Sequence, residues 1–477
     1  MNQQGTLYFH DYETWGADPK RDRPAQFAGI RTDLDLNIIS EPDIWYCQLA
    51  NDYLPHPQAA LITGITPQLC QQKGLPETEF MRNILTRFAE PETCVTGYNN
   101  LRFDDEVTRY SLYRNFYDPY AREWQHGNSR WDIIDMVRAC YALRPEGINW
   151  PLHENGNPSF RLEHLTKANA VEHANAHDAL SDVYATIAIA KLIKTRQPRL
   201  FQYLFNLRRK NAVSELIDVA GITPLVHVSS KFPASQGCTS LIAPLAWHPT
   251  NKNAVICYNL QADPAPLLHD DTDTLLAKMY SRTEDLAEGE QRLGLKLVHL
   301  NKCPVLAPLN TLSAERAAQL GIDLTLCQQN LQWLRQHPQV QQTVTQVFAQ
   351  NNEFKPETNP DYQLYSGFIS NPDKQKAEYL HGLTPQQLAA EPLVFADERL
   401  NNLLFLYRAR NYPTTLTHEE QQKWQRYCAD KLMHGKDNPN LTLEAFGLEL
   451  ENLAHEHSAD EQKMKILKAL YQYAQSL

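Results

Sequence analysis

Residues 7–16 read LYFHDYETWG and organise the rest of the chain. The apolar run Leu7 to Phe9 leads into Asp11 and Glu13, which predicts a buried β-strand. Side chains alternate faces along a strand, so the two carboxylates project to the same side. Neighbouring carboxylates repel each other, and a divalent ion such as Mg²⁺ relieves that repulsion through oxygen ligands. The D-x-E pattern is short and common, and the simpler alternative is a pair of solvated carboxylates.

The composition is that of a globular protein with more than one core. A chain of 477 residues predicts about two to four domains. The nine cysteines are dispersed and form no C-x-x-C pair, which argues against structural zinc and against disulfides. We see no leader and no apolar run long enough to span a bilayer. We therefore expect a soluble cytoplasmic protein, and a monomer because no interface stripe stands out.

The net charge of −11 does not by itself favour a nucleic-acid partner. Residues 191–210, however, contain seven cationic side chains and no acidic one. Such a local basic stretch can attract phosphates while the acidic remainder keeps the molecule soluble. The alternative is a solvated helix face. The cationic residues are Lys191, Lys194, Arg196, Arg199, Arg208, Arg209 and Lys210.

Residues 114–138 are unusually rich in aromatic side chains interleaved with arginines. Bases of a single strand stack on such rings, and guanidinium groups bind the phosphates. The alternative is that the rings belong to the core, as most aromatic side chains do. The rings are Phe116, Tyr117, Tyr120, Trp124 and Trp131, and the arginines are Arg114, Arg122, Arg130 and Arg138.

Three further residues complete a catalytic set with the first strand. Asp104 stands in a polar turn before a predicted helix, and His177 and Asp182 open another. A structural histidine and an aspartate favoured by the helix dipole are the simpler explanation for the last two. Together with Asp11 and Glu13, however, the acids are what a two-metal phosphodiesterase centre requires.

Each member of this set has a predicted role. Asp11 bridges both ions, Glu13 and Asp182 complete the site that carries the nucleophilic water, and Asp104 supports the second ion. His177, with an ordinary pKa of about 6.5, is suited to act as the general base near neutral pH.

The order D-x-E, then an aspartate before a helix, then H-x₄-D resembles the DEDDh group of 3′→5′ exonucleases, which have an RNase H-like fold. Longer stretches are similar to the bacterial exonuclease I family, whose members act on single-stranded DNA. These stretches are residues 23–28, 61–67, 97–107, 113–135, 142–151 and 159–194.

The resemblance implies a Mg²⁺-dependent enzyme with two metal ions, Mn²⁺ being an alternative metal. Such an enzyme removes 5′-mononucleotides processively from the 3′ end of single-stranded DNA, in DNA repair and recombination. It also implies that Arg161 contacts the terminal nucleotide. The strand path would be lined by Arg109, Tyr120, Trp124, Arg138 and Arg144.

The family also implies a partner protein. Its members hold a basic pocket for the acidic C-terminal tail of single-stranded DNA-binding protein. Our candidate residue for that contact is Arg335.

We expect three domains. Residues 1–196 form an α/β exonuclease domain, RNase H-like with a mixed sheet. Short β-rich runs between residues 213 and 307 predict a small barrel, and the resemblance implies an SH3-like barrel domain with appended helices over residues 197–352. Residues 353–477 form a C-terminal helical domain. Within these domains we expect helix caps at Ser159, Asp397 and Ser458.

Two other functions stay open. An RNA-trimming DEDDh exonuclease has the same metal chemistry, because RNA differs from DNA at a site mainly through the 2′-hydroxyl. A catalytically silent single-strand-binding module is the second. The filled catalytic positions disfavour it, since such a module has no reason to keep mutually repelling carboxylates.

Overall fold

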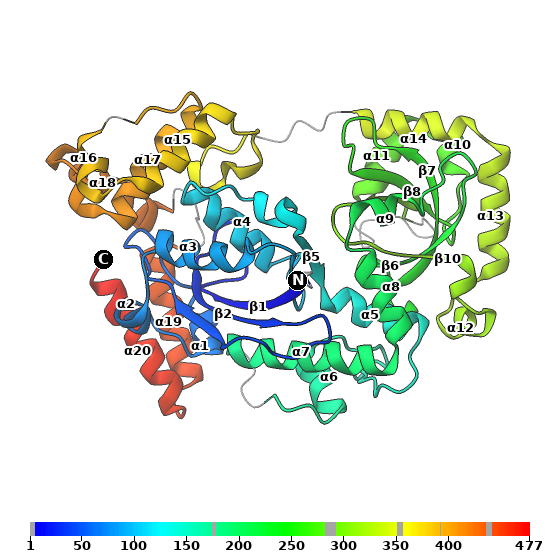
Figure 1. Ribbon diagram of the computed structural model, residues 1–477, viewed down its shortest axis with the longest axis horizontal. Helices are drawn as coiled ribbons and strands as arrows, with labels where there is room; N and C mark the ends of the chain where they lie inside the picture. The colour runs from blue at the N-terminus through cyan, green and yellow to red at the C-terminus, as the bar shows by residue number, and fades with distance from the viewer. Residues whose placement is uncertain (1–4, 174–177, 282–291, 351–355, 392, 436–440) are drawn as a thin grey trace. The chain divides into compact units, whose positions relative to one another are not determined.

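The computed structural model describes residues 5–173, 178–281, 292–350, 356–391, 393–435 and 441–477 (Figure 1). The chain forms two compact units, each of which joins segments that are distant in sequence. Unit 1 consists of Met1–Ser129, Ala174–Tyr184 and Lys355–Leu477, and unit 2 consists of Arg130–His173 and Ala185–Phe354. The predicted domain boundaries at 196/197 and 352/353 stay predictions.

Unit 1 is built on a mixed β-sheet with the strand order β3-β2-β1-β4-β5. β1 pairs antiparallel with β2 and parallel with β4, and β2 pairs antiparallel with β3. The predicted α/β class with a mixed sheet is confirmed. The boundary between the units falls within β5. The strands are β1 (Thr6–Thr14), β2 (Pro24–Thr32), β3 (Asp43–Tyr46), β4 (Thr93–Gly97) and β5 (Ser129–Asp132).

One face of this sheet packs against α3 (Glu77–Phe88) and α4 (Asp104–Arg114), which lie on the same side of it (Figure 1). Apolar residues of α3 recur at helical spacing, and they bury against aromatic side chains of β1 and β2. Because strand side chains alternate, Asp11 and Glu13 lie on the face opposite Tyr12. The packed residues include Tyr8, Tyr12, Phe27, Phe80, Ile84 and Phe88.

The C-terminal helices share cores with the N-terminal part of unit 1. α19 and α20 pack with the short helices α1 (Pro57–Thr63) and α2 (Pro67–Lys73). α15 and α17 pack against aromatic residues of α4. The helices are α15 (Asn371–Gly382), α16 (Pro385–Ala390), α17 (Glu398–Asn411), α18 (His418–His434), α19 (Leu443–Glu456) and α20 (Glu461–Gln475).

Two of the three predicted helix caps are wrong. The α20 cap is Asp460, whose side chain accepts hydrogen bonds from the backbone N–H groups of Gln462 and Lys463, so Ser458 lies outside the helix. The helix after Ser159 begins at Leu162 and is preceded by Arg161, which makes no side-chain cap. The predicted cap Asp397 is confirmed, because its side chain accepts from the Arg399 N–H.

Unit 2 contains a second sheet, antiparallel throughout, with the order β10-β6-β7-β8-β9. The predicted short β-rich runs are confirmed in its strands: β6 (Leu225–Val228), β7 (Thr239–Trp247), β8 (Ala254–Asn259), β9 (Leu295–His299) and β10 (Val305–Pro308). Its helices are α5 (Ile133–Leu143), α6 (Leu162–Ala168), α8 (Pro198–Asn206), α9 (Lys210–Ser214), α10 (Pro266–His269), α11 (Thr272–Tyr280), α12 (Ala314–Gln319), α13 (Leu324–Gln336) and α14 (Gln339–Ala349).

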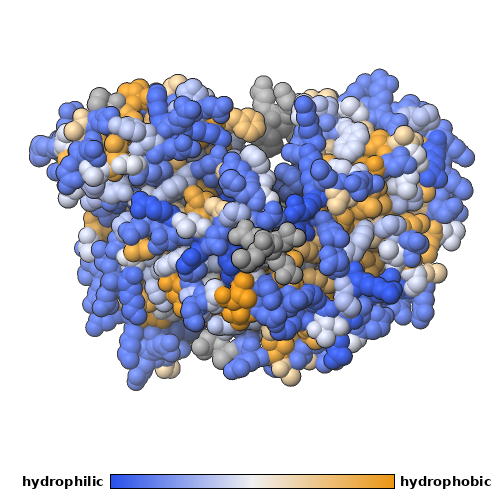
Figure 2. All heavy atoms as spheres, viewed as in Figure 1, coloured by the Kyte–Doolittle hydropathy of each residue, from blue (hydrophilic) through white to orange (hydrophobic). Residues whose placement is uncertain are grey.

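One helix, α7 (Ala179–Arg196), begins in unit 1 and continues in unit 2. All nine cysteines are buried, and the structure joins none of them in a disulfide. The described helices include none with the length and apolarity needed to cross a membrane. Hydrophilic side chains predominate on the face drawn in Figure 2.

Candidate active site

Three carboxylates from two elements of unit 1 meet at one point. Asp11 and Glu13 project from β1, and Asp182 projects from the first turn of α7. Each offers one carboxylate oxygen, and these oxygens all lie within 4.8 Å of one another. Oxygen ligands at this spacing can share one divalent cation. The structure thus brings together three of the four predicted metal ligands directly.

The fourth predicted ligand, Asp104, lies beside the same strand. It is the first residue of α4 and is only 4% exposed. Its Oδ1 accepts a hydrogen bond of 3.2 Å from the backbone N–H of Tyr12, the residue between Asp11 and Glu13. This bond holds the Asp104 carboxylate against the acidic stretch of β1.

The electrostatics of the cluster favour a bound cation. Burial raises the pKa of Asp11 well above its usual range, and the negative charges of Asp104, Glu13 and Asp182 raise it further. Burial, together with Asp182 and Asp104, raises the pKa of Glu13 to about 9. Burial and like charge both disfavour ionised carboxylates, whereas a divalent ion favours them. The donor set therefore fits a hard cation such as Mg²⁺.

A fifth carboxylate, Asp178, belongs to the same cluster although it was not among the predicted site residues. Its charge contributes to the raised pKa of Asp11 and of Glu13. Gln26, which pairs with Glu13 in the β1–β2 register, donates a long hydrogen bond of 3.5 Å to the Asp178 Oδ1. The sequence signal that could have identified Asp178 was its position directly after His177. The predicted general base His177 lies outside the described residues.

A buried ion pair fixes the start of α4 behind the site. Arg122 Nη2 donates to Asp105 Oδ1 at 2.9 Å, and both side chains are fully buried. The guanidinium lies over the ring of Phe88, 4.9 Å from its centre. Thr108 Oγ1 also donates to the hydroxyl of Tyr12 at 3.0 Å. These contacts lock the turn that carries Asp104 onto β1.

Arg109, predicted to line a strand path, is buried and paired with carboxylates. Its Nε and Nη2 donate to Glu123 at 2.8 and 2.9 Å, and its Nη1 donates to Glu106 at 2.6 Å. The guanidinium also lies 5.4 Å from the ring centre of Tyr120. Arg109 therefore supports the neighbouring rings and is not a free cation.

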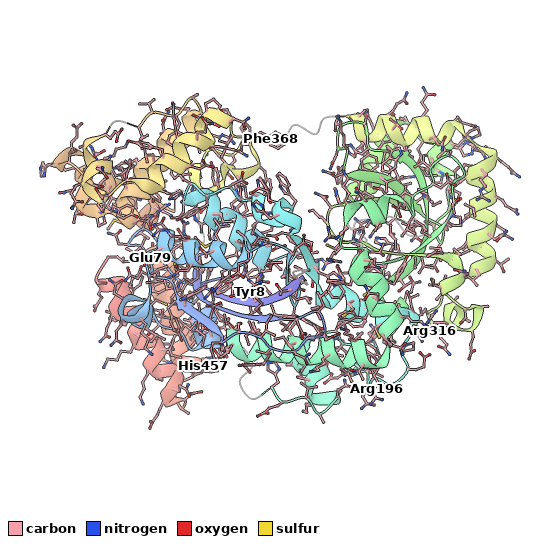
Figure 3. The ribbon with its side chains drawn as sticks, viewed as in Figure 1. Tyr8, Glu79, Arg196, Arg316, Phe368 and His457 are labelled. Carbon is pink, nitrogen blue, oxygen red and sulfur yellow. The ribbon has the colours of Figure 1, made fainter. Side chains whose placement is uncertain are left out.

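Unit 1 also carries exposed aromatic side chains, one of which contacts Arg109. Trp124 is 66% exposed. Tyr365, from the C-terminal part of the chain, donates from its hydroxyl to Glu106 at 2.6 Å and packs edge-on against Tyr110. Three residues further along, Phe368 is fully exposed (Figure 3). Sequence reasoning missed Tyr365 and Phe368, because nothing in the sequence places their segment beside α4.

The remaining predicted contact residues belong to unit 2. Arg161 and Arg144 are exposed, and Arg144 donates to the carbonyl oxygen of Thr311 at 2.9 Å. Arg138 pairs with Asp135 at 2.8 Å and lies over Phe160. Arg335 is exposed, and its Nη2 donates to the carbonyl oxygens of Gly221 and Ile222, each at 3.1 Å.

Comparison with known families accounts for nearly the whole chain. A family described as Exonuclease matches residues 8–190, the Exonuclease I SH3-like domain matches residues 208–350, and the Exonuclease I C-terminal domain matches residues 358–477. The chain is 54% identical over 475 residues to the exodeoxyribonuclease I of Escherichia coli (strain K12), which covers 100% of this chain and 98% of that protein.

Solved structures match equally well. The zinc-bound form of the E. coli ExoI–ssDNA complex has a TM-score of 0.94 and 54% identity, covering 99% of each chain. A complex described as SSB/Exonuclease I with the inhibitor CFAM has a TM-score of 0.91 and 52% identity, covering 99% of this chain and 100% of that one.

Fold and site together define an exonuclease with an RNase H-like catalytic domain, an SH3-like domain and a C-terminal helical domain. The chain is therefore an enzyme, as predicted. It belongs to the exonuclease I family.

Proposed function

We propose that this protein is a Mg²⁺-dependent 3′→5′ exodeoxyribonuclease that degrades single-stranded DNA processively to 5′-mononucleotides. The observation that carries the proposal is the convergence of the Asp11, Glu13 and Asp182 oxygens within 4.8 Å. The carboxylate of Asp104, on α4, accepts a hydrogen bond from β1 at Tyr12, the residue between Asp11 and Glu13. The relative bound to single-stranded DNA and zinc supports both the substrate and the need for a metal.

The chain's own residues divide the work of hydrolysis. Asp11, Glu13, Asp104 and Asp182 would hold two Mg²⁺ ions, for which Mn²⁺ would substitute. The bound ions would supply stabilisation of charge on the attacking and leaving oxygens. His177 takes the proton of the attacking water, because its ordinary pKa lies near neutral pH. The Asp105–Arg122 pair holds the start of α4, and with it Asp104, against β1.

Four aromatic residues form the strand path in unit 1. The exposed rings of Trp124, Tyr365 and Phe368 and the half-buried ring of Tyr120 offer faces on which bases stack irrespective of sequence. Arg109 holds two of these rings through its contacts to Tyr120 and Tyr365. In unit 2, Arg161 contacts the terminal nucleotide, while Arg138 and Arg144 attract the phosphates.

Release of end labels tests direction and product. A single DNA strand labelled in its last 3′ nucleotide should release the label first, as a 5′-mononucleotide, in the presence of Mg²⁺. A strand labelled at its 5′ end should release the label last. Early release of the 5′ label would overturn the direction, and faster release from the matching RNA would make the protein an RNA-trimming exonuclease instead.

We also propose that the protein binds the acidic C-terminal tail of single-stranded DNA-binding protein through Arg335. A relative is described in a complex with SSB, which supports the partner. Titration of a fluorescent tail peptide should show weaker binding to Arg335→Ala than to the wild type. Arg21→Ala, which alters a cation in unit 1, serves as the control. Equal affinity of all three proteins would remove Arg335 from the contact.

The proposed setting is DNA repair and recombination in the cytoplasm, with the enzyme acting as a monomer. Native mass measurement should give 54.8 kDa, the mass of one chain. A stable species of twice that mass would contradict the monomer.

A further inference from the structure

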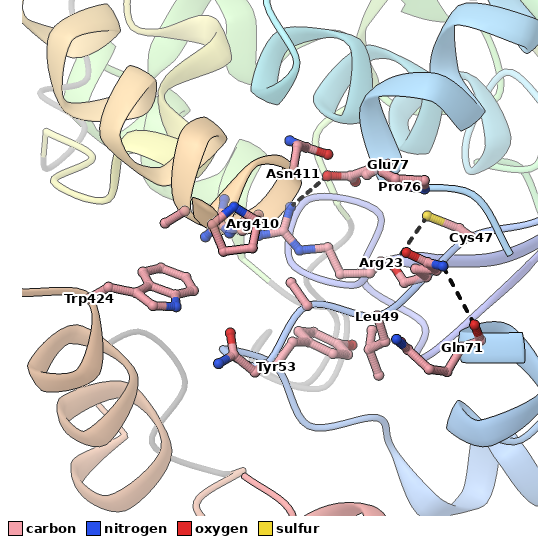
Figure 4. Close-up of a pocket in the computed structure, with 15 residues that line it drawn as sticks. Arg23, Cys47, Leu49, Tyr53, Gln71, Pro76, Glu77, Arg410, Asn411 and Trp424 are labelled. Atoms are coloured by element: carbon pink, nitrogen blue, oxygen red, sulfur yellow. Dashed lines mark hydrogen bonds and ion pairs between the residues drawn. The ribbon is translucent and has the colours of Figure 1, made fainter. Parts of the chain in front are cut away.

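A cavity in unit 1 lies apart from the carboxylate cluster. It has a volume of about 450 Å³, within the range of small-molecule sites (Figure 4). Its walls come from the segment between β3 and α1, from α2, from the start of α3, and from α17 and α18. None of the predicted catalytic residues lines it.

Buried charges surround the cavity. Arg410 donates to Asp361 at 2.7 Å and to Asp52 at 2.8 Å, and Lys431 donates to Asp52 at 2.8 Å. Although burial opposes ionisation, the charge of Arg410 holds the pKa of Asp52 and that of Asp361 below their usual range. Both carboxylates are therefore ionised at neutral pH.

The third carboxylate of the network is Glu77. It accepts from Arg114 Nη2 at 2.7 Å, and its other oxygen lies 3.9 Å from Arg23 Nη1. These ion pairs join four cations and three carboxylates into one buried network. The cations are Arg23, Arg114, Arg410 and Lys431, and the carboxylates are Asp52, Asp361 and Glu77.

One buried donor at the cavity wall lacks a hydrogen bond. Arg23 lines the cavity and is only 7% exposed. Its Nη2 donates to Asp361 at 2.8 Å, whereas its Nη1 has no hydrogen-bond partner among the described residues. A buried guanidinium donor left unsatisfied is costly, and an anionic oxygen is its strongest partner.

The other walls suit a flat, partly apolar body. Tyr53, Leu49 and Trp424 lie around the cavity in the close-up (Figure 4). Asn51 and Gln71 also line it and are exposed, so they mark its mouth. A compact planar molecule can thus enter from solvent and reach the arginine.

We propose that this cavity is a binding site for a compact planar organic oxyanion, which hydrogen-bonds to Arg23. The ligand supplies the hydrogen-bond acceptor that Nη1 lacks. Its planar body packs between the aromatic and aliphatic walls. The site is separate from catalysis, and the proposal does not depend on the reaction that the enzyme performs.

Calorimetric titration of the full chain with benzoate tests the site. Benzoate should bind with one molecule per chain. Benzamide, its neutral counterpart of the same shape, should have an affinity lower by about tenfold or more, because it lacks the charge-assisted hydrogen bond. Phenyl phosphate is the third probe. Tighter binding of benzoate identifies carboxylates as the natural ligands, and tighter binding of phenyl phosphate identifies phosphate monoesters.

Three variants locate the binding. Asn51→Trp fills the mouth of the cavity and should abolish benzoate binding while leaving exonuclease activity unchanged. Asn402→Trp places the same side chain at an exposed position of α17 outside the cavity and should bind benzoate as the wild type does. Arg23→Met should also lose binding. If that variant does not fold, the Asn51→Trp result decides alone.

Absence of saturable benzoate binding to the wild type would overturn the proposal. So would equal affinity for benzoate and benzamide, or unchanged benzoate affinity in Asn51→Trp.

Discussion

At the scale of single residues, the carboxylate cluster lowers the stability of the metal-free protein and provides the ligands that cleavage needs. Asp11→Asn should lower exonuclease activity by about a thousandfold, because metal-assisted charge stabilisation is worth several kcal/mol and each ~1.4 kcal/mol is a factor of ten. In chelator the same variant should unfold at a higher temperature than the wild type, because it removes one of the mutually repelling buried carboxylates.

The two measurements are a steady-state assay with Mg²⁺ and a thermal melt with chelator. Glu41→Gln, an exposed acid outside the site, is the matched control and should change neither. A metal-free Asp11→Asn protein that melts below the wild type would show that the cluster is held together by contacts other than metal ions.

Trp124 is the residue whose exposure most directly indicates strand binding. Trp124→Ala should weaken the binding of a single-stranded oligonucleotide by about 1–3 kcal/mol, the usual value of one base stacked on a ring. Fluorescence anisotropy in chelator measures the affinity without cleavage. Trp247→Ala is the control, since Trp247 is also an exposed tryptophan, 46% accessible, on β7 of unit 2. Equal losses in the two variants would argue against a specific platform at Trp124.

At the scale of helices and strands, the sequence predicted best where local pattern and tertiary packing agree. The sequence predicts a helix over residues 77–88 from its apolar spacing, and strands over 225–228 and 254–259 from short β-rich runs between turns. The structure has these elements with the same bounds, Glu77–Phe88, Leu225–Val228 and Ala254–Asn259. The failed caps have a different cause. Ser458 and Asp460 both suit an N-cap, and only the three-dimensional start of the helix distinguishes them.

The acidic residues of the candidate site were predictable from the sequence, whereas the contacts of the residues around it were not. Asp11, Glu13 and Asp182 stand in recognisable motifs, and the fold brings them together. The burial of Arg109 was not predictable, because its partner Glu123 lies in a 3₁₀ turn beyond its own helix. The contact of Tyr365 with Glu106 was not predictable either, because more than half of the chain length separates the two residues in sequence.

The second sheet should weaken in acid because of His227 on β6. This side chain is 4% exposed and donates from Nδ1 to the Val305 carbonyl oxygen at 2.8 Å. Burial lowers its pKa to about 3, below the ordinary 6.5 of the unfolded chain. The unfolded state therefore binds more protons between these values, so stability falls as the pH drops from about 6.5 to about 3, by up to about 1.4 kcal/mol per unit.

Denaturant unfolding at several pH values checks this expectation. His227→Gln keeps a donor but does not titrate, so its stability should fall less steeply than that of the wild type over this window. His418→Gln, at the first position of α18 in unit 1, is the control. Parallel pH profiles for the wild type and His227→Gln would contradict the assignment.

At the scale of the whole molecule, a chain of net charge −11 must bind a polyanion. Local cations therefore have to carry the affinity, and binding should weaken steeply with salt. For a single strand, the logarithm of the affinity falls by about 0.7 for each neutralised phosphate per unit of log salt. Anisotropy titrations in chelator over a range of salt concentrations measure this slope. An affinity independent of salt would exclude a cationic strand path.

The activity proposed for this protein is metal-dependent cleavage of a single DNA strand at the cluster of Asp11, Glu13, Asp104 and Asp182. The most direct measurement follows a 5′-labelled single-stranded oligonucleotide with Mg²⁺, beside its duplex, its RNA counterpart, a chelator control and Asp182→Asn. We expect progressive shortening of the single DNA strand alone, abolished by chelator and by the substitution. Shortening that persists in Asp182→Asn, or tight strand binding without any cleavage, would contradict the central claim.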